Sequence, residues 1–137
     1  MGRYAHEFVI RSIKLLDMGY VTAIYLLIAV FLSNVIDRAL TPVDESMERQ
    51  KSLLRRTIEL IGITWLLVAT IYVVRNLVEL IPSPFDGIAG FDHFRLKELK
   101  FAAIFIFIFL FLQTHFRDKL RIYSDDMGTF ILSHSRK

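Results

Sequence analysis

The sequence lacks cysteine and has almost no excess of charge of either sign. Without cysteine there can be no disulfide framework, no cysteine nucleophile and no thiolate metal site. The 17 basic and 14 acidic residues leave a net charge of only +3, which is too even to predict nucleic-acid binding. The first 17 residues mix both charge signs and offer no small-residue cleavage site, so we expect the first apolar helix to be retained rather than removed as a signal.

Apolar residues are abundant instead and make up 54% of the 137 residues. A helix needs about 20 apolar residues to cross about 30 Å of hydrocarbon. Of the uncharged runs, only 18–36 is close to that length, and the other two must borrow flanking apolar residues. We therefore predict one all-α membrane domain over the whole chain, with three transmembrane helices at about 18–36, 57–81 and 96–116.

The second predicted helix is longer than a bilayer requires. Thr41 can cap it, Pro42 suits its first position, and only Gly62 interrupts the good helix formers before Pro82. If it is continuous over 42–81, its length at about 1.5 Å per residue is about 60 Å. We therefore expect residues 42–57 to leave the bilayer as a polar stalk.

A stripe of mostly small side chains follows helical spacing in the first span. In membranes small residues let helix backbones approach closely, so this stripe is the predicted packing face. Small residues are also common in membrane helices by chance, and that alternative stays open. The stripe consists of Gly19, Thr22, Leu26, Ala29 and Ser33.

The third apolar run, "FAAIFIFIFLFLQTHF", alternates phenylalanine as a strand would. A lone strand in lipid would leave its backbone unpaired, so a helix is predicted. On a helix Phe105 and Phe109 share one face, and Phe107 and Phe111 share the opposite one. In the tail, 117–137, we expect a basic helical end, a turn at 125–128, and an apolar run at 129–132 that forms an edge strand or an interfacial anchor.

Charged residues gather where the second helix should end. Arg75 and Glu79 lie one helical turn apart in apolar sequence, and in an antiparallel bundle they share an end with Asp17. We interpret Arg75, Glu79 and Asp17 as a structural charge cluster that fixes helix register. The alternative is an ion or proton path, which would need further polar residues along the same face.

The loop 82–94 combines prolines, glycines and aromatic side chains. It is too apolar for a free aqueous loop, so we expect it to dip into the headgroup region or to dock on a partner protein. Its predicted docking residues are Pro82, Pro84, Phe85, Phe91 and Phe94.

No catalytic or cofactor site is predicted. Asp86, Asp92 and His93 lie close together in the loop, but their spacing matches no calcium-binding loop, and we predict no metal site there. The other histidines are scattered, and the sequence predicts no soluble domain that could shape a pocket. We therefore expect a protein that is not an enzyme and carries no cofactor.

The segment "VRNLVELIPSPFDGIAGFDHFRLKEL", 74–99, resembles small multi-span membrane proteins of nucleocytoplasmic large DNA viruses. These viruses build a capsid over an internal lipid membrane. The resemblance implies a virion inner-membrane or minor capsid component. It supplies no functional residue to carry over.

Two functions are therefore open at the level of sequence. The first is a structural multi-pass protein in the internal membrane of a virus particle, with the lipid bilayer and capsid or other virion proteins as partners and with further copies of itself as candidates. The second is a small accessory subunit or an oligomeric channel in a host or cellular intracellular membrane. A channel predicts polar residues along one continuous face, whereas the sequence places them mainly near the ends of the spans.

Overall fold

The computed structural model describes residues 2–95 and 102–135, and every regular element in these ranges is helical. The expected all-α class is thus confirmed for the described chain. In order, the elements are α1 (Gly2–Ala39), α2 (Glu45–Gln50), α3 (Leu53–Glu79), the short 3-10 helices η1 (Ile88–Gly90) and η2 (His93–Arg95), α5 (Ala103–Leu112) and α6 (Thr114–His134).

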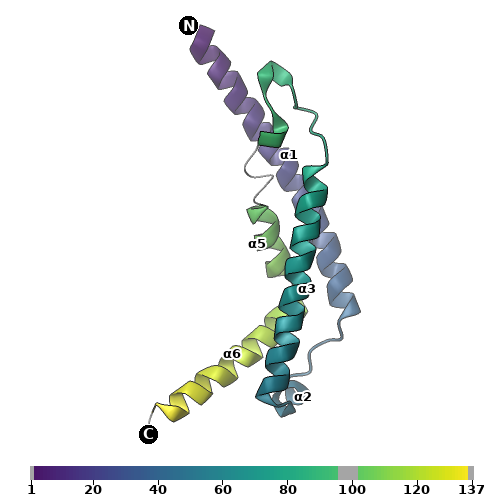
Figure 1. The fold of residues 1–137 in the computed structure, drawn as a ribbon, viewed down its shortest axis with the longest axis vertical. Helices are drawn as coiled ribbons and strands as arrows, with labels where there is room; N and C mark the ends of the chain where they lie inside the picture. The colour runs from purple at the N-terminus through teal and green to yellow at the C-terminus, as the bar shows by residue number, and fades with distance from the viewer. Residues whose placement is uncertain (1, 96–101, 136–137) are drawn as a thin grey trace.

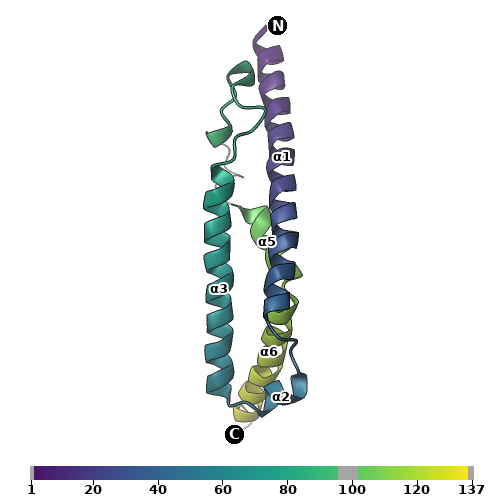
Figure 2. The same ribbon diagram turned by 90° about the vertical axis from the view of Figure 1, so that its right-hand side faces the viewer.

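Two long helices set the shape of the molecule. α1 and α3 run in opposite directions along its long axis, and α6 leaves the pair at an angle (Figure 1; Figure 2). α1 has 38 residues and α3 has 27, and both are long and apolar enough to cross a membrane. They contain the first two predicted spans, 18–36 and nearly all of 57–81.

The buried face of α1 is a ridge with a spacing of four residues. Ridges with this spacing are the commonest contact surface between packed helices. The predicted small-residue stripe shares only part of this ridge, because Gly19 and Leu26 are exposed and Thr22 is half-buried. The ridge residues are Ile13, Asp17, Val21, Tyr25, Ala29 and Ser33.

Aromatic rings of α5 explain why the packing face differs from the predicted one. Phe105 and Phe109 are fully buried and stack with centroids 5.1 Å apart, and the Tyr25 ring lies 5.5 Å from Phe105. Bulky rings, rather than close backbone approach, therefore fill the seam. Phe107 and Phe111 are exposed, which confirms the predicted division of α5 into two faces.

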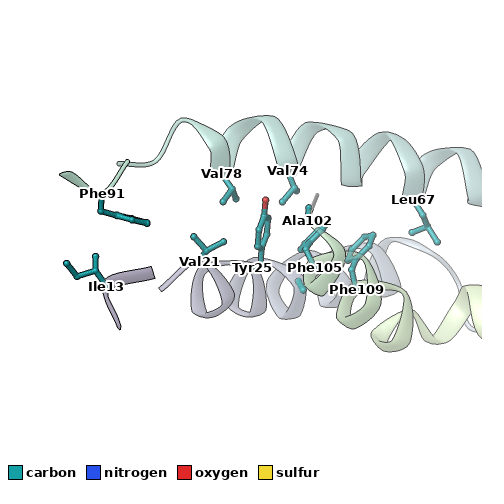
Figure 3. Close-up of a cluster of buried hydrophobic side chains, with 11 residues drawn as sticks. Ile13, Val21, Tyr25, Leu67, Val74, Val78, Phe91, Ala102, Phe105 and Phe109 are labelled. Atoms are coloured by element: carbon teal, nitrogen blue, oxygen red, sulfur yellow. The ribbon is translucent and has the colours of Figure 1, made fainter. Parts of the chain in front are cut away.

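The core lies between the two long helices. Figure 3 shows Leu67, Val74 and Val78 of α3 pointing toward the Tyr25 ring and the α5 phenylalanines. The core is apolar along this length, and the buried polar side chains lie toward the two ends.

The sequence left open whether the helix over 42–81 is continuous, and the structure shows that it is broken. Lys51 and Ser52 have extended backbones that separate α2 from α3, and the Ser52 hydroxyl caps α3 by accepting from the Arg55 amide at 3.3 Å. Asp44, rather than Thr41, caps α2. A straight stalk over 42–57 is not confirmed, because α2 turns aside next to α6 (Figure 2).

The third predicted span also differs from the structure. Gln113 has φ −72° and ψ 94°, which ends α5 and starts α6 in a new direction. The ten residues of α5 are about 15 Å long, half of a bilayer core. Residues 96–101 of the expected span lie outside the described residues, so a third span is not confirmed. The predicted turn at 125–128 and the alternative of an edge strand at 129–132 are wrong, because α6 continues through both.

Candidate functional site

A buried carboxylate closes the loop end of the helix pair. Asp17 is 0% exposed, and its Oδ2 lies 2.7 Å from Nδ1 of His93, while its Oδ1 accepts the hydroxyl of Ser83. If Asp17 is ionised, its carboxylate can only accept hydrogen bonds, and Nδ1 of His93 is then the donor in this pair. His93 and Ser83 are also buried. We call these three residues the Asp17 lock.

The loop after α3 folds back onto α1 around this lock. The Asp86 carboxylate accepts the His93 amide at 2.9 Å, and the Gly87 amide donates to the Phe91 carbonyl at 2.8 Å. Gly87 and Gly90 both have φ of 79°, a backbone region that favours glycine. The Phe91 ring turns toward Ile13 of α1 (Figure 3). The loop is therefore closed onto its own chain.

This closure changes the predicted charge cluster. Asp17 is bonded to Ser83 and His93 rather than paired with Arg75 or Glu79. Arg75 is exposed and Glu79 is half-buried. The expectation that Asp17 helps to fix helix register stays a prediction, now with loop residues as its partners.

The predicted docking loop is only partly available to a partner. Phe91 is buried against the chain, which leaves little of its ring for a partner, and Phe85 is half-buried. Pro82, Pro84 and Phe94 are exposed. Any partner would therefore meet the two prolines and the Phe94 ring.

The loop acids do not converge on a metal site. Asp92 pairs with Arg95 at 3.0 Å, whereas Asp86 bonds to the backbone of His93. Within the described ranges, no group of three or more potential metal-binding side chains occurs.

A ring of alternating charge closes the opposite end. Lys51 lies 2.8 Å from Glu48 and 2.7 Å from Glu59, and Lys119 lies 3.1 Å from Glu48 and 2.6 Å from Glu59. Each lysine therefore bridges both glutamates. We call Glu48, Lys51, Glu59 and Lys119 the charge ring. It ties α2, the residue that follows α2, α3 and α6 together.

Two effects oppose each other at Glu48. Burial would raise the pKa of the Glu48 carboxyl, but hydrogen bonds from Lys51 and Lys119 outweigh it and lower this pKa below its usual 4.5. Glu48 is thus held ionised, as the ring requires.

A second set of ion pairs fastens α6 further along its length. Arg56 of α3 and Arg49 of α2 both donate to Asp126 of α6, the latter at 2.6 Å. The hydrogen bond from Arg56 lowers the pKa of Asp126 below its usual 3.8. Thr57 donates to the Tyr123 hydroxyl at 3.1 Å. α6 is therefore held by several polar contacts rather than by one.

The start of α6 is capped by a different helix. Asp37 of α1 accepts the amides of Thr114 at 3.0 Å and His115 at 3.3 Å, while the side chain of Gln113 provides no cap. A carboxylate here satisfies two free amides and favours the positive end of the helix dipole. His115 Nδ1 lies 2.8 Å from the Thr41 carbonyl, which can only accept, so this nitrogen donates.

An open cavity of about 580 Å³ lies beside the charge ring. Its lining comes from the connection at 40–44, from α2 and Lys51, and from α3 and α6. We call it the interfacial cavity. Its apolar wall is formed by Leu40, Val43, Ile63 and Leu66, and its polar wall by the charge ring and His115.

Neither end has the arrangement of a nucleophilic catalyst. In such sites the hydroxyl contacts the imidazole, which is oriented by the acid. Here the Ser83 hydroxyl and His93 both contact Asp17, so the serine has the acid as its partner instead. The geometry therefore suits a structural lock.

Most of these residues were not predicted from the sequence. The predictions did not include Ser83 or the four residues of the charge ring, and they considered His93 only as a metal ligand. The one available signal was the four-residue spacing of Asp17 with Ile13 and Val21, which places it on a buried ridge. No protein-family model, curated protein or solved structure matches this chain.

Proposed function

We propose that this chain is a structural multi-pass membrane protein that joins a lipid bilayer to a protein layer. One observation carries the proposal: the apolar windows of α1 and α3 are only 22% and 11% buried. A core helix of a soluble protein would have most of such a window buried, because exposed apolar surface costs about 25 cal/mol per Å². Lipid around these faces removes that cost.

The polar closures at both ends support a structural role. The Asp17 lock holds the loop on α1, and the charge ring holds α2 and α6 against α3. Closed ends make a rigid body that spans the apolar region and presents fixed surfaces on each side. α6 projects from this body with Phe130, Ile131 and Leu132 exposed toward its end, a surface suited to a partner.

The finer proposal places this protein in the internal membrane of a large DNA virus particle, with capsid or neighbouring membrane proteins as partners. The resemblance of 74–99 supports it. The loop 82–94 lies within the segment that carries the resemblance. It folds compactly on α1 and still exposes Pro82, Pro84 and Phe94.

The channel alternative has less support. A water-filled path needs polar side chains along one face, but the cluster between the long helices is apolar from Ile13 to Phe109. An accessory subunit of a cellular membrane complex would use the same exposed surfaces. Only the membrane in which the protein is found distinguishes this alternative from the virion role.

Two experiments test the proposal in sequence. Extraction of membranes with alkaline carbonate should leave the chain in the pellet, and release into the supernatant would contradict membrane insertion. Purified virus particles stripped with detergent should then contain the chain in the membrane fraction by mass spectrometry. Its absence there, with insertion upheld, would contradict the virion role and leave the accessory subunit.

A further inference from the structure

We propose that the interfacial cavity binds the headgroup of a phospholipid that carries a primary amine, such as phosphatidylethanolamine. This inference rests on the proposed membrane location and adds a ligand to it. The volume of about 580 Å³ falls in the range of about 300–1,000 Å³ that is usual for small-molecule sites.

The lining of the cavity combines apolar and charged side chains, which suits a ligand that has an apolar part and a polar part. Ile63 and Leu66 lie on the part of α3 that continues into the apolar span, and Leu40 and Val43 face the same space. The charge ring supplies the polar part of the lining. A lipid could thus rest its glycerol and upper acyl chains on the apolar wall while its headgroup meets the ring.

Gly62 keeps part of this space open. Glycine in a helix interior costs roughly 0.5–1 kcal/mol relative to alanine. Neither backbone nor packing explains this glycine, since it has no positive φ and nothing lies within 4 Å of where its Cβ would be. Gly62 lines the cavity, so the missing side chain enlarges the site beside the charge ring.

The charge pattern selects the headgroup. The ring has two lysines and two glutamates, so its charges cancel and it offers no net attraction to a headgroup that is only an anion. Each ring lysine donates to two carboxylates and keeps a third N–H for a ligand. The more accessible ring members are one of each sign, since the Lys51 and Glu59 side chains are 25% and 27% exposed, against 10% for Lys119 and 8% for Glu48. A zwitterion can contact Lys51 through its phosphate and Glu59 through its cation.

Hydrogen bonding then distinguishes ethanolamine from choline. A primary ammonium has three N–H donors for Glu59, and its hydrogen bonds to a carboxylate are charge-assisted. A quaternary ammonium has no N–H and cannot form them. His115 adds an acceptor, because its Nδ1 donates to Thr41 and leaves Nε2 as the acceptor of the neutral ring.

Native mass spectrometry of the full chain in detergent tests this site. Ethanolamine, choline and glycerol phospholipids with identical acyl chains would be added at equal concentration. We expect the wild-type chain to retain the ethanolamine lipid roughly tenfold more tightly than the others, a difference of about 1.4 kcal/mol. Gly62→Leu, which fills the cavity, should abolish this preference, whereas Gly19→Leu, at an exposed glycine of α1 with equally open surroundings, should keep it.

A second variant leaves the shape of the cavity unchanged. Glu59→Gln removes the acceptor charge, so it should bring ethanolamine and choline lipids to equal affinity. Equal binding of all three lipids by the wild-type chain, or a preference that survives both Gly62→Leu and Glu59→Gln, would overturn the proposal. Retention in the carbonate pellet together with equal lipid binding would reject this site alone, whereas release from the pellet would reject the membrane function beneath it.

Discussion

Asp17 is a buried carboxylate on an otherwise apolar ridge of α1, and its partners determine whether that burial is tolerable. Removal of an ionised group from water costs several kcal/mol unless hydrogen bonds replace the lost hydration. Ser83 and His93 provide those bonds, and both come from a loop more than 60 residues away in sequence. The same contacts that satisfy Asp17 therefore hold the loop.

We predict that Asp17→Ala destabilises the protein by about 3 kcal/mol, because it leaves His93 and Ser83 buried without their acceptor. Unfolding of the detergent-solubilised chain by increasing denaturant measures the change. Lys14→Ala, at an exposed position one turn earlier on α1, should change stability by less than about 0.5 kcal/mol. Equal effects of the two substitutions would show that the lock has no special role.

At the residue scale, local periodicity was a good guide and long-range pairing was not. The helical repeat alone predicts that Phe105 and Phe109 lie on one face of α5 and that Phe107 and Phe111 lie on the opposite face. The bond between Asp17 and His93 joins residues 76 positions apart, and no local rule could pair them. Phe91 was predicted to take part in docking because its loop is apolar. In the structure the loop closes onto α1, and the Phe91 side chain is buried there.

At the scale of elements, α6 depends on ionised carboxylates. The pKa values of Glu48 and Asp126 are lowered in the folded protein, so their contribution to stability is present above their usual values of 4.5 and 3.8. It is lost as the pH falls below those values and through the lowered pKa values of the folded state. Hydrogen bonds from Lys119 and Lys51 lower the pKa of Glu59 further, to about 2, so we predict that α6 detaches from α3 only on acidification from pH 7 to about pH 2.

Spin labels can follow this detachment, since the sequence has no native cysteine. Labels at Leu54→Cys on α3 and Ser124→Cys on α6, both exposed positions, should give a narrow distance distribution at pH 7 and a broad one at low pH. Labels at Ile61→Cys and Leu77→Cys, both on α3, should keep their distance. A distribution between α3 and α6 that stays narrow at low pH would argue against carboxylate control.

Lys119 is the ring member that α6 contributes, so its loss tests the same attachment at neutral pH. We predict that Lys119→Ala costs about 3 kcal/mol, because Glu48 is left buried with one partner fewer. Arg121→Ala is the matched control, since its contact with Glu45 is long at 3.8 Å and exposed, and surface pairs contribute about 0–1 kcal/mol. Chemical denaturation compares the two, and an equal loss would reject the importance of the ring.

The two helix breaks show what the sequence could not reveal at this scale. No proline or glycine marks residues 51 and 52, so the sequence carried no signal for a break there and left the continuity of the helix open. The break places Lys51 between Glu48 and Glu59, and the capping hydroxyl of Ser52 compensates for the lost helical bonds. At Gln113 the compensating cap is Asp37 from α1, which only the tertiary structure can supply.

At the scale of the whole molecule, the contacts place two parts of the chain at opposite ends of the helix pair. The loop at 82–95 lies at the Asp17 end, whereas the start of α6 is bonded to Asp37 at the other end. α5 supplies ten of the residues between these two points. If the helix pair spans a membrane as we propose, the loop and α2 lie on opposite sides of it, and α6 lies on the side of α2.

We predict that a membrane-impermeant maleimide distinguishes these sides in sealed vesicles. Phe94→Cys in the loop, and Met47→Cys and Ser124→Cys at the other end, are substitutions at exposed positions in a chain without native cysteine. From one side of the vesicle, Phe94→Cys should react while Met47→Cys and Ser124→Cys are protected, or the reverse, and detergent should make all three reactive. Reaction of Phe94→Cys and Ser124→Cys from the same side would mean that the segment between 95 and 114 does not cross. The charge ring would then have to form across a lipid bilayer, which its distances of 2.6–3.1 Å do not permit, so the membrane placement of α1 and α3 itself would have to be abandoned.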